Sequence, residues 1–435
     1  MIGWLTRRRA TAAIAVYASS ALGILGALAA LRILGPTDAG RLAIVLGAVD
    51  FISSVLWLTS DEALVKYGFR YSAQQDWGRF HRLVRLTFSL EVLASIGAAV
   101  LIVAIAPFVD SIFSGADDLE TAMLVAAFLP ALQAVESIGD TLVILRGRYD
   151  IRGFLLVYTM GLRFVGLVIG AQHGVTEAVV GVVAAQALGT ATVFTVGLLA
   201  LRRFPAAAPV HLGADRRPIV RFVLQSSVFT GLVSVRTWIA PLVLGIVRTA
   251  TDVGLFRAAQ APQQGFAVLI SPVHLILLTD QTRDWERGRP TAVLSGLRRY
   301  VVGSTLLMAL VVPPAIWAMP WLVTFLLGDE YEPAVVAAQI VLVAAAIHLV
   351  FGWTKSFPVT IGRPGLRLIA HGVESAVLLP LLVILGREWG VTGAGVAVLF
   401  SAVAFALTWV VLVAWLRRTG FGLEGAQPAA VTAPR

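Results

Sequence analysis

The sequence predicts an all-α integral membrane protein with about 12 transmembrane helices, in two six-helix bundles related by a parallel internal repeat. Three observations predict this fold class. Apolar runs of about 20 or more residues fill the chain, and basic residues gather in every second connection between them. Short motifs also return at a nearly constant spacing along the chain, as expected of a duplication.

The apolar runs exclude a soluble domain. Of the 435 residues, 58% are hydrophobic and 14% are charged, which is more apolar surface than a soluble interior can bury. One crossing of the hydrocarbon, about 30 Å thick, needs roughly 20 helical residues. The runs predict spans at 11–34, 39–66, 82–107, 119–146, 153–172, 176–201, 219–247, 252–279, 296–326, 333–358, 363–386 and 391–416.

The basic residues predict the orientation of these spans. If the N-terminus is cytoplasmic, most of the 34 Lys and Arg residues fall in cytoplasmic connections. The outer connections then hold only Arg32, Arg41, Arg248 and Arg387. This alternation predicts that both termini are cytoplasmic. The net charge of +9 therefore serves orientation, and we expect no nucleic acid as a partner.

The repeat is visible in four pairs of motifs. GPTDAGRL, from Gly35, and TATDVGLF, from Thr249, share Thr-Asp-x-Gly 214 residues apart. The other pairs lie at nearly the same spacing: FSGADDLETA with LLGDEYEPA, RGRYDIRG with TIGRPGLR, and HGVTEA with WGVTGA. Because six spans is an even number, both copies enter the membrane in the same direction, so a parallel repeat is predicted. The predicted parts are residues 1–210, residues 211–418 and a disordered cytoplasmic tail at 419–435, with 202–218 as a flexible joint.

These motifs resemble those of a known family. ILGPTDAGRLA, LLGDEYEPA, IGRP and WGVTGAGVAV are similar to segments of the oligosaccharide flippase (Wzx-like) polysaccharide biosynthesis family. That family belongs to the multidrug/oligosaccharidyl-lipid/polysaccharide (MOP) flippase superfamily. The resemblance implies translocation of a polyprenyl-diphosphate-linked oligosaccharide across the bacterial cytoplasmic (inner) membrane. It supplies no catalytic motif, so candidate sites must come from the chemistry of the residues.

Charged residues inside the apolar spans are the candidates for substrate binding, because charge at bilayer depth is costly and marks function. Arg236 lies 12 residues, about 18 Å of helix, from Arg248 at the outer end of its span. A guanidinium near the midplane suits a diphosphate, since it stays charged and donates to paired oxygens; structural pairing is the alternative. Asp50 aligns with Gln264 at the repeat spacing, and an Asp50–Arg236 contact is a hypothesis for a gate between the halves. With Arg163, these are the candidate substrate-binding residues.

A second set of candidates concerns ion coupling. Glu136 and Asp140 share one helix face at i, i+4, and Arg163 on the next span lies at a depth similar to that of Glu136. Two interpretations stay open: a structural ion pair between Glu136 and Arg163, or a carboxylate stripe that binds a proton or sodium ion. His371 and Glu374, at i, i+3, are candidates for a proton relay, with hydrogen-bonded packing as the alternative.

Three functions were weighed against these residues. A lipid-linked oligosaccharide flippase is favoured over a cation-coupled multidrug exporter of the same fold, because the intramembrane arginines disfavour cationic drugs. A membrane-embedded polysaccharide polymerase is disfavoured, since the outer connections are short and no Asp-x-Asp metal motif occurs. We expect a transporter rather than an enzyme, with no cofactor and no metal site. The expected partners are lipid-linked oligosaccharide, membrane lipids, H⁺ or Na⁺ as coupling ion, and polysaccharide assembly proteins.

Overall fold

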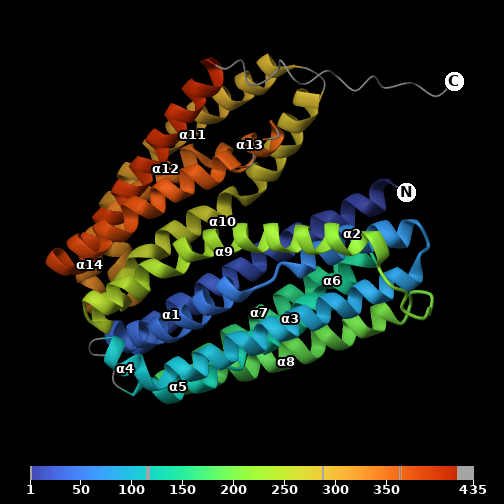
Figure 1. The fold of residues 1–435 in the computed structure, drawn as a ribbon. Helices are drawn as coiled ribbons and strands as arrows, with labels where there is room; N and C mark the ends of the chain where they lie inside the picture. The colour runs from blue at the N-terminus through green and yellow to red at the C-terminus, as the bar shows by residue number, and fades with distance from the viewer. Residues whose placement is uncertain (1, 114–117, 287–288, 362, 364, 419–435) are drawn as a thin grey trace. The chain divides into compact units, whose positions relative to one another are not determined.

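The computed structural model describes residues 2–113, 118–286, 289–361, 363 and 365–418. Side chains within this part are described except at 2–13, 228–237, 266–280, 282–283, 286, 290 and 359. The described residues form helices and no strand, and they pack as two compact units (Figure 1). The first unit is Met1–Ala258 with Leu326–Tyr331, and the second is Ala259–Phe325 with Glu332–Arg435. The tail predicted to be disordered, 419–435, lies outside the described residues.

The first unit holds most of the helices. In chain order they are α1 (Ile2–Leu56), α2 (Ser60–Ala73), α3 (Trp77–Ile105), α4 (Val109–Ile112), α5 (Leu119–Ala126), α6 (Leu129–Leu145), α7 (Tyr149–Ala171), α8 (Val175–Leu201), α9 (Arg216–Val247) and the start of α10 (Ala250–Glu286). The second unit holds the rest of α10 with α11 (Pro290–Leu327), α12 (Val335–Val350), α13 (Phe357–Thr360) and α14 (Gly365–Arg418). Short 3₁₀ turns, among them η2 (Gly213–Asp215), η3 (Asp329–Ala334) and η4 (Gly352–Lys355), connect some of them.

Eight helices of the described part are long and apolar enough to cross a membrane. Two of them, α1 and α14, are much longer than the roughly 20 residues that one crossing needs. Each bends at one glycine, Gly35 (φ 70°, ψ 174°) and Gly390 (φ 55°, ψ −132°), where a positive φ costs glycine little. Each therefore supplies two crossings, as the sequence predicts at 11–34 and 39–66 and at 363–386 and 391–416. The predicted all-α membrane fold is confirmed.

Three predicted spans end or break earlier than their hydropathy indicates. The run 39–66 is interrupted between α1 and α2, where Asp61 and Glu62 in the first turn of α2 favour a new helix start. The run 119–146 divides into α5 and α6 because Pro130, in the first turn of α6, has no amide proton for a continuing helix. In the run 333–358, α12 ends at Val350 and short helical turns follow.

The two Thr-Asp-x-Gly motifs contact each other inside the first unit. Thr37 Oγ1 and Thr251 Oγ1, the equivalent threonines of the two motifs, share a hydrogen bond of 2.9 Å. The equivalent glycines, Gly40 and Gly254, lie so close to the backbone of the opposite helix that a Cβ would overlap a carbonyl oxygen. Each motif thus meets its own counterpart, as expected of two repeats about an axis along the membrane normal.

Small residues also bring other helices of the first unit into backbone contact. On α7, Gly166 lies against the backbone of Gly181 on α8, and on α6, Gly139 lies against Gly197 of α8. Helices in lipid gain no hydrophobic drive by associating, so close van der Waals approach over small residues is a main source of their packing. The hairpin α7–α8 and its contact with α6 form the framework of the candidate site.

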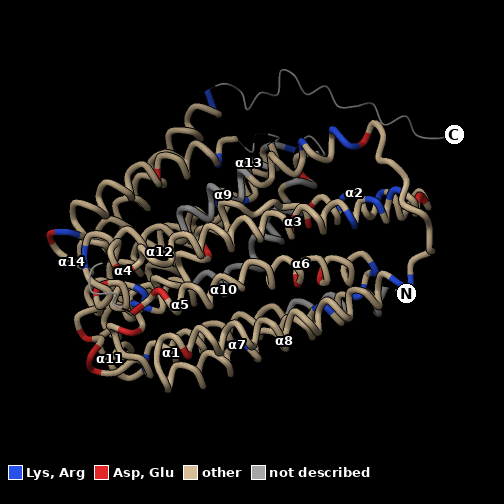
Figure 2. The backbone as a smooth tube through the Cα atoms, turned by 60° about the horizontal axis from the view of Figure 1, so that its bottom comes forward, with Lys and Arg blue, Asp and Glu red and all other residues tan. Residues whose placement is uncertain are grey.

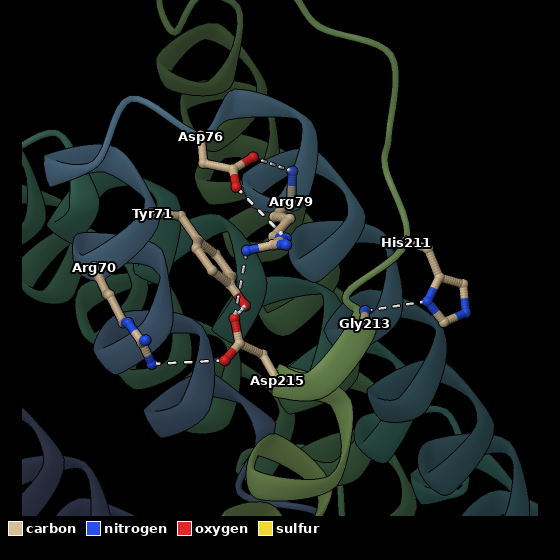
Figure 3. A network of polar contacts seen from close by, with 7 residues as sticks. All are labelled: Arg70, Tyr71, Asp76, Arg79, His211, Gly213 and Asp215. Atoms are coloured by element: carbon tan, nitrogen blue, oxygen red, sulfur yellow. Dashed lines mark hydrogen bonds and ion pairs between the residues drawn. The ribbon is translucent and has the colours of Figure 1, made fainter.

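The connection 202–218, predicted as a flexible joint, packs onto the first unit instead. Its Phe204 and Leu212 are buried, and Val210 donates its backbone amide to the Gly78 carbonyl at 3.1 Å. At its end, Asp215 accepts a hydrogen bond from Tyr71 Oη at 3.0 Å (Figure 3). Burial and this hydrogen bond raise the pKa of Tyr71 to about 12, so the phenol remains a donor.

Arginines complete this anchor. Arg70 and Arg79 each lie 3.8 Å from a carboxylate oxygen of Asp215, and Asp76 caps the start of α3 by accepting from the Arg79 amide (Figure 3). A Gly/Ala/Pro composition indicates flexibility, but the apolar and acidic residues at the ends of this stretch bind it to α2 and α3.

The glycine contact between the motifs is testable by adding one methyl group. Gly40→Ala and Gly254→Ala are each expected to lower the free energy of unfolding by about 1–3 kcal/mol, because the helices must separate to admit the Cβ. The control is Gly47→Ala on the same α1, whose Cβ would meet Leu242 Cδ2 at an ordinary 3.6 Å. Melting temperatures in one detergent compare the three variants; equal loss in all three would contradict the crossing.

Candidate functional site

Asp50 of α1 is the acidic centre of a charged cluster within the first unit. Two guanidinium groups act on its carboxylate, Arg163 of α7 and Arg257 of α10. Asp50 is half-buried, and the Arg257 guanidinium lies 5.5 Å from the ring centre of Trp238. Two cations therefore lie within electrostatic reach of one carboxylate inside apolar helices.

Arg163 is also joined to Glu136, but through an intermediate residue. Arg163 Nε donates to Gln186 Oε1 at 2.7 Å, and the Gln186 amide nitrogen donates to Glu136 Oε2. The same nitrogen donates to Thr190 Oγ1 at 3.0 Å. The predicted neighbourhood of Glu136 and Arg163 is present, and the buried Gln186 amide relays between the two charges.

Asp140, one turn further along α6, has a different partner. Its carboxylate pairs with Arg152 Nε at 2.8 Å, and both side chains are partly exposed. Glu136 and Asp140 share a face of α6, but Glu136 belongs to the Gln186 network and Asp140 to an ion pair with α7. Both interpretations of this stripe stay open, with each carboxylate engaged in this conformation.

The second unit holds a separate polar cluster around Glu374 of α14. Glu374 is only 2% exposed, and His348 Nε2 and His371 Nδ1 each lie 3.1 Å from one of its carboxylate oxygens. Both imidazole rings lie 5.1 Å from the ring centre of Phe405. The structure thus brings the predicted pair His371 and Glu374 together and adds His348 from α12.

Two other predicted residues contribute less. Arg236 lies on α9, but its side chain falls outside the described residues, and so does the hypothesised Asp50–Arg236 contact. Gln264 is exposed on the part of α10 that belongs to the second unit. Among the described residues, no group of three or more His, Cys, Asp or Glu side chains is arranged to hold a metal ion.

Sequence reasoning missed three members of these clusters. Gln186 is a lone amide in the apolar run VVAAQALGT, a signal that was available because buried amides need partners. Arg257 lies near the start of the predicted span 252–279, where a basic side chain is expected to snorkel or to pair. His348 is a single histidine in the predicted span 333–358, and nothing in the sequence shows that α12 brings it to Glu374 of α14.

Basic residues surround an open hollow in the first unit, with a volume of about 1460 Å³. Figure 2 shows Lys and Arg concentrated at the end of this unit that carries α2. The ionisable side chains that line the hollow come from α2, α9 and the connection before α9: Lys66, His211, Arg216, Arg217 and Arg221. Among the described residues, no carboxylate lines the hollow. The described lining of the hollow therefore carries a net positive charge.

The chain has relatives among protein families and solved structures. A family model described as "Polysaccharide biosynthesis protein" matches residues 28–336. The chain belongs to this family. The resemblance seen in the sequence motifs is confirmed. A search of curated protein sequences found no match.

Several solved structures, transporters of the MOP superfamily among them, have a fold similar to that of this polysaccharide biosynthesis protein. An inward-facing multidrug resistance MATE family transporter of the MOP superfamily matches with a TM-score of 0.67 and 16% identity, over 92% of this chain and 96% of that one. Lipid II flippase MurJ, in an inward closed conformation, matches with a TM-score of 0.67 and 11% identity, over 93% and 87%. A MOP superfamily transporter from Pyrococcus furiosus matches at 0.64 and 14%, over 97% of both chains. At these identities the likeness shows the fold, which is that of the MOP superfamily.

The Gln186 relay is testable through stability. Gln186→Leu, similar in volume, is expected to lower the free energy of unfolding by about 1–3 kcal/mol, because Glu136 and Arg163 then lose buried hydrogen bonds. The control is Thr192→Val on the same helix, whose exposed hydroxyl bonds only its own helix carbonyl. Denaturation in a fixed detergent measures both, and a Gln186→Leu variant as stable as the control would show that the relay is dispensable.

Proposed function

We propose that this protein is a flippase that translocates a polyprenyl-diphosphate-linked oligosaccharide, of the polysaccharide or O-antigen repeat-unit type, by alternating access. It acts in the bacterial cytoplasmic membrane with both termini in the cytoplasm. The observation that carries the proposal is Arg163, which is hydrogen-bonded to Gln186 within apolar helices and, like Arg257, acts electrostatically on Asp50, in a polysaccharide biosynthesis protein. Arg236 is a further proposed contact for the diphosphate.

The chemistry of the cargo explains why such a cluster is useful. A diphosphate cannot enter hydrocarbon unpaired, and guanidinium groups offer permanent charge with paired donors. In the absence of substrate, two arginines would leave unbalanced positive charge at bilayer depth, which is costly. Asp50 offsets part of this charge, and a bound diphosphate supplies the rest at the same cations. The carboxylate then helps to release the substrate by reclaiming them.

The basic hollow supports the same class of substrate. If the N-terminus is cytoplasmic, α9 begins at the cytoplasmic face, and Arg216, Arg217 and Arg221 lie at the level of the lipid phosphates. The hollow also exposes Val220 and Leu224, apolar contacts that suit a lipid chain beside its head group. Phosphate-bearing lipids, the substrate among them, are thus proposed partners, together with polysaccharide assembly proteins.

The fold supports transport by rocking of two repeats. Among proteins of this fold, MurJ is named a lipid II flippase and another a multidrug resistance transporter. A cation-coupled multidrug exporter is the second candidate for this chain. The arginines disfavour this function. A cationic drug would need the Asp50 carboxylate as its partner, but Arg163 and Arg257 lie near Asp50 and would repel the drug.

Coupling to a proton gradient is proposed at the Glu374 cluster. A carboxylate held between His348 and His371 can exchange a proton with either imidazole, the side chain whose ordinary titration lies nearest neutral pH. Glu136 and Asp140 are the alternative ion-coupling residues, but each is engaged by another partner in this conformation.

A reconstituted flipping assay tests the substrate class. The wild-type protein in proteoliposomes is expected to move a polyprenyl-diphosphate oligosaccharide between leaflets. Arg163→Gln is expected to slow this movement about tenfold or more, since one charge-assisted contact is worth about 1.5–3 kcal/mol. Asp50→Asn is expected to slow it about tenfold through substrate release, with folding nearly intact.

One control variant and two possible outcomes make this assay decisive. Arg202→Gln removes an exposed arginine from the connection after α8 and is expected to leave the rate within twofold. Unchanged flipping in Asp50→Asn would remove Asp50 from the mechanism. Efflux of a cationic dye without movement of any lipid-linked oligosaccharide would favour the exporter.

The coupling proposal has its own test. Glu374→Gln is expected to flip at the rate that the wild type shows without a proton gradient, and to gain nothing when the gradient is imposed, because the amide cannot exchange a proton. Glu388→Gln, an exposed residue of the same helix, is the matched control and should keep the response. A wild type that responds only to a sodium gradient would overturn the proton relay.

A further inference from the structure

Glu91, on α3, is a buried carboxyl group of the first unit that none of the clusters above includes. Its side chain is 3% exposed. One oxygen, Oε1, accepts a hydrogen bond from Ser60 Oγ at 2.7 Å. The other oxygen, Oε2, is buried without a hydrogen-bond partner. A buried polar atom of this kind is rare in folded proteins and calls for an explanation.

Two further unpartnered oxygens lie on the helices around Glu91. Asp61, in the first turn of α2, has a buried Oδ1 without a partner, and its charge acts on Glu91. Ser53 of α1 has a buried hydroxyl without a partner, and it lines the same small cavity as Glu91 and Ser95. Two helices, α1 and α3, thus bring the orphaned oxygens of Ser53 and Glu91 to one cavity, and the charge of Asp61 at the start of α2 acts on Glu91 from beside it.

No described cation neutralises these carboxyl groups. Among the described residues, no Lys, Arg or His forms an ion pair with Glu91 or Asp61. The other charged groups of the neighbouring helices are placed elsewhere: Asp50 with its arginines, Glu62 with Ser226, Lys66 over the Phe222 ring, and Asp140 with Arg152. The start of α2 favours one negative charge there, but the buried Glu91 carboxylate and the partly buried Asp61 carboxylate repel each other.

We infer that Glu91 and Ser53, with Asp61 beside them, form a binding site for one small monovalent cation, H⁺ or Na⁺. The cation neutralises the buried Glu91 carboxylate, lowers its repulsion with Asp61, and satisfies the orphaned oxygens of Glu91 and Ser53. The cavity, about 10 Å³, holds at most one water-sized particle and excludes an organic ligand. Carboxylate and hydroxyl oxygens are suitable ligands for Na⁺. Alternatively, a proton on one carboxyl group would supply the hydrogen-bond donor that the orphaned oxygens lack.

Occupancy of this site has a structural consequence. Thr59, in the break between α1 and α2, donates its backbone amide to Ser227 Oγ of α9 at 3.0 Å, and the Ser60 hydroxyl at the start of α2 donates to Glu91. With the cation bound, α2 begins firmly against α3. Without it, repulsion between Asp61 and Glu91 pushes the start of α2 away. The site therefore links cation binding to the position of α2, and it does so whatever the transported substrate.

The experiment measures the melting temperature of the full-length protein in phosphatidylcholine nanodiscs. Choline chloride and NaCl are compared at equal ionic strength, at about pH 6 and about pH 9. The wild type is expected to melt several degrees higher with a cation bound, because a ligand of the native state stabilises it. Stabilisation at the lower pH alone identifies H⁺, and stabilisation by NaCl at the higher pH identifies Na⁺.

Variants assign the response to the site. Glu91→Gln keeps an acceptor for Ser60 and is expected to lose more than half of the response, whereas Glu120→Gln, exposed on α5, keeps all of it. If Glu91→Gln does not fold, Ser53→Ala serves instead and is expected to need about tenfold more cation for the same shift. A wild type without a response, or a Glu91→Gln variant that responds like the wild type, overturns the inference. Because no transport is measured, failure here is separate from failure of the proposed flippase.

Discussion

The first unit depends on how closely two helices approach at the Thr-Asp-x-Gly motifs. With glycine at positions 40 and 254, the backbones of α1 and α10 touch, and the equivalent threonines can share a hydrogen bond. The bend at Gly35 turns α1 just before this contact. A loop from far along the chain joins it, since Tyr331 Oη donates to the Leu31 carbonyl at 2.6 Å. Close approach of backbone thus replaces the hydrophobic drive that helices lack in lipid.

The charged groups inside the helices share one property. Each lies near a group of opposite charge, or is hydrogen-bonded to a polar side chain that is itself bonded to one. Gln186 stands between Glu136 and Arg163, and Asp50 is shared by two guanidinium groups. In the second unit, Glu374 lies between two histidines whose charge depends on their protonation. Such arrangements reduce the cost of charge at depth while leaving partners that substrate or protons can replace. Glu91 lacks such a partner among the described residues, and this is the reason for proposing a bound cation there.

Much of the fold could be predicted from the sequence because hydropathy and basic connections are local signals. The span at 153–172 corresponds to α7, and the repeat register predicted that Thr37 and Thr251 are equivalent. Local signals do not reveal which helix faces meet. Glu136 and Arg163 were placed at equal depth by counting residues, but Gln186 joins them only because α8 packs between. The connection 202–218 was misread for a related reason, since its composition is flexible while its buried Phe204 is fixed by contacts with α3.

The repeats of the sequence and the compact units of the structure have different boundaries. The second repeat is predicted to begin near residue 211, yet α9 and the start of α10 pack with the first unit, which extends to Ala258. The predicted second repeat thus contributes α9 and the first residues of α10, up to Ala258, to the first unit. The first unit also includes Leu326–Tyr331. During synthesis, it therefore cannot be completed until the ribosome has made most of the second repeat.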